Sequence, residues 1–138
     1  MIALRVQHYL SRARDFLKGV DLLKDDLKNY RYSSALLGIH GAISYCDALR
    51  TGMGSEGLSS EDHRKAAEEL RMMLRARGYE RNQGADRLEN LLRFKGRVAY
   101  APEGSSPDFN HIVQQAERFA AWAEAEGKSL KIEGWRND

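Results

Sequence analysis

Apolar residues recur every three or four positions through most of the chain, which is the spacing of amphipathic α-helices. The first stripe predicts a helix over residues 3–28. Its members are Val6, Leu10, Ala13, Leu17, Val20, Leu23 and Leu27. A second stripe predicts a helix over residues 33–50, with a turn at residues 29–32 between them. Because the turn is short, we expect the two helices to be antiparallel neighbours.

Two more helices are predicted after a loop at residues 51–59 that contains three glycines. Ser60 has the kind of side chain that caps a helix N-terminus, so the third helix is expected to begin there and to end near Arg77. The fourth is predicted over residues 81–99. Its inward row is apolar except for Lys95, which needs a polar partner or a route to water.

A fifth helix is predicted from the Ser106 cap to Glu126, because Pro107 suits a first turn and Gly127 suits a helix stop. The remaining residues, 128–138, form a short polar tail that includes Trp135. This tryptophan either anchors a partner or folds back on the helices.

The composition predicts one all-α domain. The chain has 138 residues and only two prolines, and valine and isoleucine are sparse beside alanine and leucine. That length can bury one core without disulfides or metals. We therefore expect an up-and-down four-helix bundle with an additional helix over residues 1–127, followed by the tail at 128–138.

The location is predicted from what the sequence lacks. The single Cys46 cannot form an internal disulfide, which suits a reducing compartment. No apolar run approaches the roughly 20 residues of a membrane span, and the first residues do not have the pattern of a secretory signal. We expect a cytoplasmic protein with no membrane partner.

Charge is nearly balanced overall, at +2, but uneven along the chain. Residues 71–97 carry eight lysines and arginines against three acidic residues. Such a stretch either attracts phosphate groups or forms an ordinary solvated helix face.

The stretch at residues 91–100, LLRFKGRVAY, holds the most specific motif. Spacings of four and three place Arg93, Arg97 and Tyr100 on one helix face, away from the apolar row. The stretch resembles the ribonuclease motif of the HEPN superfamily, in which arginine is followed after four to six residues by histidine and then, two residues later, by tyrosine. Val98 stands at the position of the histidine.

The resemblance extends over residues 32–126. It also rests on the small and apolar residues at 35–43, and on the segments at 62–64 and 116–122. Membership in this superfamily implies five helices around a four-helix core and a homodimer with the arginine site near its interface. Relatives include RNA-cutting toxins, partners of nucleotidyltransferases, and inactive binding modules.

Val98 makes nuclease activity of the family type unexpected, because valine neither transfers a proton nor donates a hydrogen bond. The leading interpretation is a non-catalytic binding or assembly module without a cofactor. Arg93, Arg97 and Tyr100 would then engage a nucleotide, RNA or a protein such as a nucleotidyltransferase. Alternatively, the two arginines pair with acidic residues on a neighbouring helix and Tyr100 closes the end of the bundle.

A second polar group stands on the predicted second helix. His40, Ser44 and Asp47 share one side of it and could face His63 at the start of the third helix. Used together with Arg93, these histidines would suit a divergent ribonuclease of toxin–antitoxin type. The alternative is a buried hydrogen-bond network that joins the two helices. No metal-binding motif is present, so no metal is expected.

A third interpretation gives the chain no ligand site at all. The chain would be an assembly subunit whose tail and Trp135 engage another protein. The sequence has no phosphate-loop, dinucleotide-binding or hydrolase-elbow motif, so it gives no support to those enzyme classes.

Overall fold

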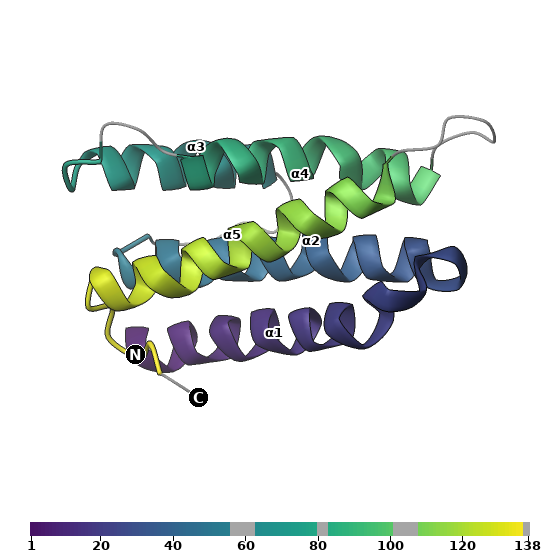
Figure 1. The fold of residues 1–138 in the computed structure, drawn as a ribbon. Coiled ribbons are helices and arrows are strands. Elements are labelled where there is room, and N and C mark those ends of the chain that lie inside the picture. Colours follow the sequence, from purple (N-terminus) through teal and green to yellow (C-terminus); the bar gives the residue numbers. More distant parts are fainter. Residues whose placement is uncertain (56–62, 80–82, 101–107, 137–138) are drawn as a thin grey trace.

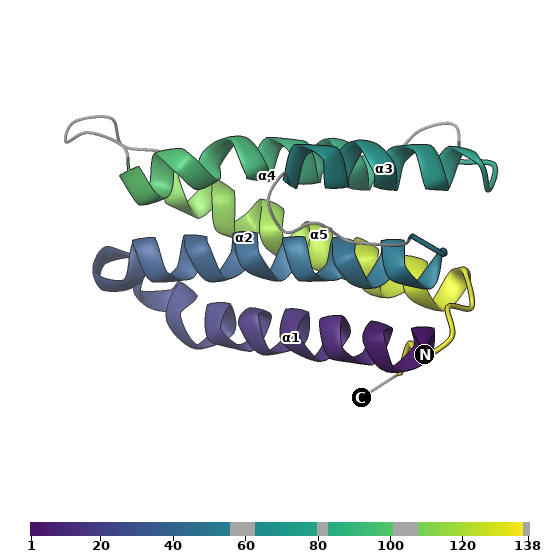
Figure 2. The same ribbon diagram turned by 180° about the vertical axis from the view of Figure 1, so that it is seen from behind.

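The computed structural model describes residues 1–55, 63–79, 83–100 and 108–136, apart from the side chains at positions 99 and 100. Within these ranges the regular structure is entirely helical, which confirms the all-α prediction (Figures 1 and 2). The elements are α1 (Ile2–Leu23), a 3₁₀ turn η1 (Lys24–Asp26), α2 (Leu27–Gly52), α3 (His63–Arg75), α4 (Gln83–Tyr100) and α5 (Phe109–Ser129).

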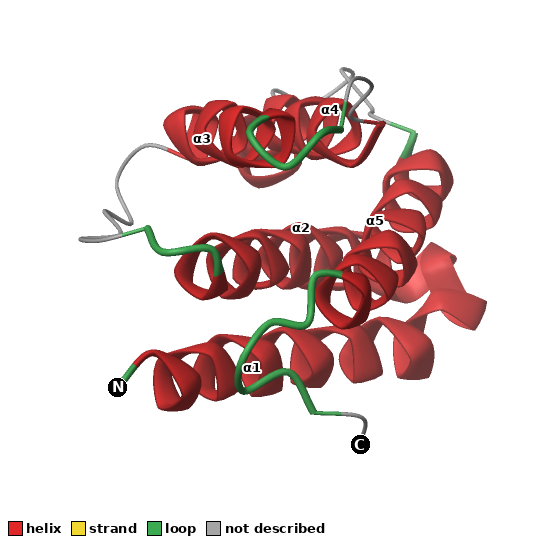
Figure 3. Cartoon of the chain, turned by 90° about the vertical axis from the view of Figure 1, so that its left-hand side faces the viewer, coloured by secondary structure: helices red, strands yellow, loops and turns green. Residues whose placement is uncertain are grey.

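The helices pack lengthwise around α2. Helices α1 and α2 are antiparallel neighbours, as predicted, and α5 crosses along α2 (Figure 1). Viewed from one end, α3 and α4 lie side by side above α2, while α1 lies below it (Figure 3). Helix α3 runs in the same direction as α2, whereas α1, α2, α4 and α5 alternate in direction.

The predicted apolar stripes form the core. From α1 the core takes Val6, Leu10, Ala13 and Val20, all at most 1% exposed. The middle of α2 is buried on nearly every side, because other helices surround it. The core therefore follows from the sequence pattern, apart from the ends of the helices.

The predicted turn at residues 29–32 contains the non-helical Tyr30, but the first helix ends and the second begins several residues before that range. Helix α1 ends at Leu23, and the side chain of Asp26 caps α2 by accepting a hydrogen bond from the Asn29 backbone. Tyr30 then has non-helical backbone angles inside α2. The short polar side chain of Asp26 sets the start of α2, so the chain turns earlier than residues 29–32.

Both predicted ends of the fifth helix also differ. Asp108 caps α5 by accepting a hydrogen bond from the backbone of His111. The proposed cap Ser106 lies outside the described residues, as does Ser60 at the start of the third helix. Gly127 does not stop α5, which continues to Ser129, because Gly127 instead makes room for the ring of Trp135.

Among the described helices, none combines the length and the apolar character needed to cross a membrane.

Candidate functional site

Helix α4 divides its residues between the core and the surface. Leu88, Leu91 and Val98 are buried, whereas Arg93 and Arg97 are exposed on another side of the helix. The helix continues to Tyr100, but the side chain of Tyr100 lies outside the described residues. Neither arginine forms an ion pair with a described residue, so the predicted pairing with acidic residues is not seen there.

Arg97 belongs to an aromatic group instead. Its guanidinium carbon lies 5.8 Å from the centre of the Phe94 ring. Phe94 in turn meets His111 of α5 edge to face, with ring centres 6.3 Å apart. Such cation–π and edge contacts hold an arginine near the surface without neutralising its charge.

A second group of the same kind stands where α2 begins. Arg31 lies 5.3 Å from the ring centre of Tyr32 and 5.8 Å from that of Phe109. Tyr32 and Phe109 meet edge to face at 5.0 Å, and Tyr32 is 52% exposed. The ring of Tyr32 therefore has a surface open to a ligand.

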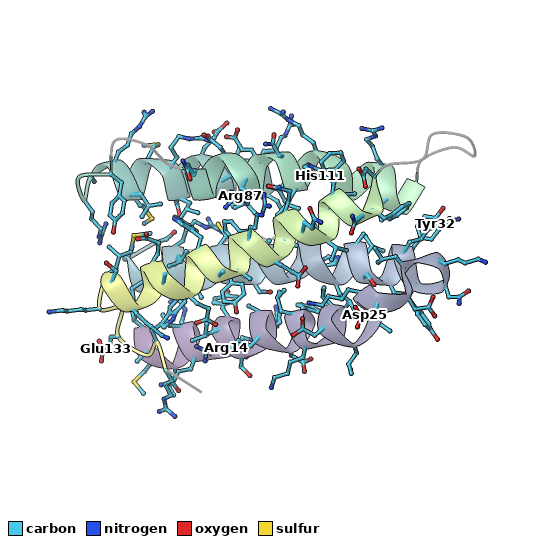
Figure 4. All side chains as sticks on the ribbon, in the orientation of Figure 1. Arg14, Asp25, Tyr32, Arg87, His111 and Glu133 are labelled. Atoms are coloured by element: carbon cyan, nitrogen blue, oxygen red, sulfur yellow. The ribbon has the colours of Figure 1, made fainter. Side chains whose placement is uncertain are left out.

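The two groups lie at one end of the molecule, because Phe109 and His111 both belong to the first turn of α5. Figure 4 labels Tyr32 and His111 in that half. We name this surface the basic-aromatic end. Its members are Arg31, Tyr32, Phe94, Arg97, Phe109 and His111. Of these, only Arg97 was singled out from the sequence. The contacts of Tyr32 with Phe109 and of Phe94 with His111 join helices that are distant along the chain.

Arg93 lies one turn from Arg97 and lines a cleft between α3 and α4. The cleft has a volume of about 260 Å³ and is also lined by Arg64, Glu68 and Glu89. Arg93 donates a hydrogen bond to the amide oxygen of Asn90 at 3.2 Å. Its surroundings therefore combine both signs of charge.

The local positive charge of residues 71–97 is partly neutralised. Arg71 forms ion pairs with Asp86 and Glu89, which join α3 to α4. Arg87 donates from Nε to the side-chain oxygen of Gln115 at 3.0 Å. Fewer arginines of this stretch are thus open to phosphate groups than the sequence count suggests.

The histidines of the second polar group influence each other electrostatically. Burial lowers the pKa of His40 below its usual value, and the charges of Lys95 and His63 lower it further. His63 also lies close enough to Asp47 to influence the pKa of that carboxyl group. Arg93 is not among the charges acting on His40.

Asp47 takes part in a network that joins α2 to α3. Arg50, with a side chain only 7% exposed, pairs with Asp47 at 2.7 Å and with Glu69 at 3.2 Å. Glu69 also accepts a hydrogen bond from Ser55. Burial nevertheless raises the pKa of Asp47 above its usual value, because these contacts offset the loss of hydration only in part.

The opposite end of the molecule holds a network around Glu124 that the sequence did not predict. Arg14 donates to both carboxylate oxygens, at 2.7 and 2.8 Å. The Tyr45 hydroxyl donates at 2.8 Å and the Trp135 indole at 3.2 Å. Partial burial by itself would raise the pKa of Glu124, but these hydrogen bonds outweigh it and hold the pKa below its usual value. Arg14 and Glu124 are 110 residues apart, so no local spacing indicates the pair.

Other chemistry finds little support in the described residues. No three of their histidine, cysteine, aspartate and glutamate side chains are arranged to hold a metal ion. Cys46 is buried against the carbonyl of Ala66, and burial raises the pKa of its thiol to about 12. This thiol is therefore protonated near neutral pH.

No protein-family model matches the chain, and neither a curated protein nor a solved structure matches it. The similarity to the HEPN superfamily accordingly remains a prediction from the sequence.

Proposed function

We propose that the chain is a non-catalytic binding module of HEPN type that engages RNA through the basic-aromatic end. The observation that carries this proposal is the pair of arginines, Arg31 and Arg97, held over aromatic rings at one end of the bundle. The alternation of α1, α2, α4 and α5, with α3 added, is compatible with the expected bundle.

The chemistry of this surface suits single-stranded RNA. The exposed face of Tyr32 can stack on a base, and Arg31 beside it and Arg97 at the same end can contact phosphates. Arg31 and Arg97 form no ion pair with a described residue and so keep their positive charge for a ligand, whereas Arg71 is paired with Asp86 and Glu89. Among the described residues Arg93 is hydrogen-bonded to Asn90 and is not paired with a histidine or carboxylate, so we propose binding without cleavage.

The direct test is fluorescence anisotropy with a labelled single-stranded RNA at two salt concentrations. Tyr32→Ala is expected to weaken binding by about 1–3 kcal/mol, the usual contribution of one stacked base. Arg97→Ala should weaken it less and should reduce the salt dependence by about one phosphate contact.

Arg5→Ala is the matched control, because it removes the same charge from the exposed start of α1, at the other end of the molecule. It should leave RNA binding nearly unchanged. The proposal would be contradicted if RNA did not bind, or if Arg5→Ala weakened binding as much as Arg97→Ala.

The proposal includes a homodimer, as expected for the superfamily. Met1, Ile2 and Leu4 are exposed apolar side chains at the start of α1, which is a feature of association surfaces, but they lie at the end opposite to the arginines near which the resemblance places the interface. Light scattering on the purified chain tests this part, and a monomer at all concentrations would rule it out.

A second candidate function is a divergent ribonuclease. The observation in its favour is that the charge of His63 acts on both His40 and Asp47. A neutral imidazole, which the lowered pKa of His40 provides, is the form that accepts a proton. This candidate predicts RNA cleavage that disappears in His40→Ala and persists in His8→Ala, a control at an exposed histidine of α1. Absence of cleavage by the unmodified chain would leave only the binding module.

A further inference from the structure

A pocket of about 250 Å³ lies between α1 and the segment that follows α5. Gln7, Ser11, Arg14 and Lys18 line it from α1, and Gly134 and Arg136 line it from the other side. It is separate from the basic-aromatic end, which lies in the opposite half of the molecule (Figure 4).

The far wall of the pocket is fixed by close packing. The ring of Trp135 lies against Gly127, where an added Cβ would come within 2.0 Å of it. Gly134 has a positive φ of 92° and passes so near Ala3 that a Cβ would lie 2.4 Å from the carbonyl oxygen. A pocket whose walls are in place before binding costs a ligand little ordering energy.

The pocket collects positive charge. Of its three cationic side chains, Arg14 is paired with Glu124. Lys18 and Arg136 form no ion pair with a described residue, and no described acidic residue lines the pocket. Two like charges remain together there, and an anion between them would relieve their repulsion.

The residues that line the pocket carry donors of the kinds that bind an oxyanion. With the amide of Gln7 turned so that its oxygen faces Arg136, Nε and one Nη of the guanidinium donate to it at 3.1 Å. This contact holds the Arg136 guanidinium beside Gln7, and Ser11 and Lys18 line the same pocket. Guanidinium, ammonium and hydroxyl donors together suit a phosphate group.

We propose that this pocket binds a small phosphorylated molecule, with its phosphate group between Lys18, Arg136 and Ser11. A phosphate monoester carries a charge of about −1.5 to −2 at neutral pH, which matches the two cations without an ion pair. The volume leaves room for a few carbon and oxygen atoms beyond the phosphate, since one water occupies about 30 Å³. A ligand held by both walls would stabilise the contact between the final segment and α1.

Calorimetric titration with ribose 5-phosphate tests the proposal. Parallel titrations with malonate and with chloride, at equal ionic strength, show whether other anions bind in the same way. Ribose 5-phosphate is expected to bind at one site and to raise the melting temperature. Lys18→Gln and Arg136→Gln should each weaken binding about tenfold, the usual effect of removing one charged hydrogen bond.

Lys65→Gln and Arg75→Gln are the matched controls, since both residues are exposed on α3 and outside the pocket. They should bind ribose 5-phosphate as the unmodified chain does. The proposal fails if ribose 5-phosphate does not saturate a site, if malonate binds equally well, or if the controls lose as much affinity. Ser11→Ala, a small change at an exposed position, provides a further variant if either charge variant unfolds.

Discussion

The two ends of the bundle use arginine and aromatic side chains in different ways. At the end where α5 finishes, Arg14 pairs with Glu124, which also binds Tyr45 and Trp135. At the end where α5 begins, Arg31 and Arg97 lie over aromatic rings, and neither has a carboxylate partner among the described residues. The same residue types form a hydrogen-bonded network at the first end, which we call the closed end, and exposed cation–π contacts at the second, the basic-aromatic end.

The difference lies in the partners rather than in the arginines. One partly buried carboxylate accepts four hydrogen bonds from three residues, so the network around Glu124 stabilises the fold and leaves little of that carboxylate for a ligand. An aromatic ring orients a guanidinium but does not neutralise it, so its charge stays available. An arginine without an acidic partner is therefore a better indicator of a binding surface than a high local count of arginines.

Glu124→Ala should have the largest effect on the folded state. It removes the acceptor from Arg14, Tyr45 and Trp135 together, and a partly buried cation without its partner is costly. We expect a loss of about 2–4 kcal/mol in the free energy of unfolding, measured by urea denaturation. A change below about 0.5 kcal/mol, typical of surface positions, would mean that this end is not closed by the network.

Gly127→Ala is expected to be the next largest change. The new methyl group would overlap the ring of Trp135, and overpacking of this kind costs about 1–3 kcal/mol. Gly96→Ala is the control within α4, because nothing lies within 4 Å of its added Cβ. Since alanine favours helix over glycine, Gly96→Ala should stabilise the chain by about 0.5–1 kcal/mol. Thermal melts that shifted both variants in the same direction would contradict the packing of Trp135.

The contribution of Glu124 should also depend on pH. Its pKa is lower in the folded chain than its ordinary value of 4.5, so the folded state favours the ionised carboxylate. The stabilisation is complete above pH 4.5 and is lost as the pH falls through the lowered pKa. The difference in stability between the unmodified chain and Glu124→Gln should therefore narrow in acid. Urea denaturation at several pH values measures it, and a gap that widened in acid would reverse the expected sign.

Arg97→Ala should have the smallest effect on stability. Its side chain is exposed, and the contact recorded for it with the described residues is that with Phe94, so the free energy of unfolding should change by less than about 0.5 kcal/mol. Arg14→Ala is the matched substitution at the closed end and should destabilise the chain by at least about 1 kcal/mol. Equal losses in the two variants would remove the distinction between the ends.

The helices and the core could be predicted from the sequence because both follow from helical periodicity. The apolar rows of α1 and α4 are local patterns, so they identify the helices and the core before any contact is known. Helix ends depend on single capping groups. Asp108 caps α5 where Ser106 was expected, and Asp26 caps α2 ahead of the turn expected at residues 29–32. The prediction that Gly127 ends the fifth helix was wrong for a similar reason, because the role of Gly127 depends on its contact with Trp135 and not on its neighbours in sequence.

The candidate site was less accessible to sequence analysis. Arg93 and Arg97 were correctly placed on a face of α4 apart from its apolar row, because that needs only the helical repeat. The contacts of Phe94 with His111 and of Tyr32 with Phe109 join different helices, so they depend on how α2, α4 and α5 pack. The approach of His63 to His40 was considered from the sequence, yet only the tertiary arrangement brings them together.

The most direct measurement is a ¹⁵N NMR titration of the chain with a short single-stranded RNA. We expect shifts to concentrate at Arg31, Tyr32, Phe94, Arg97 and His111, while the Trp135 indole resonance, at the closed end, stays in place. Shifts confined to Trp135 and its neighbours, or no shifts at all, would contradict the proposal that the basic-aromatic end is the RNA-binding surface.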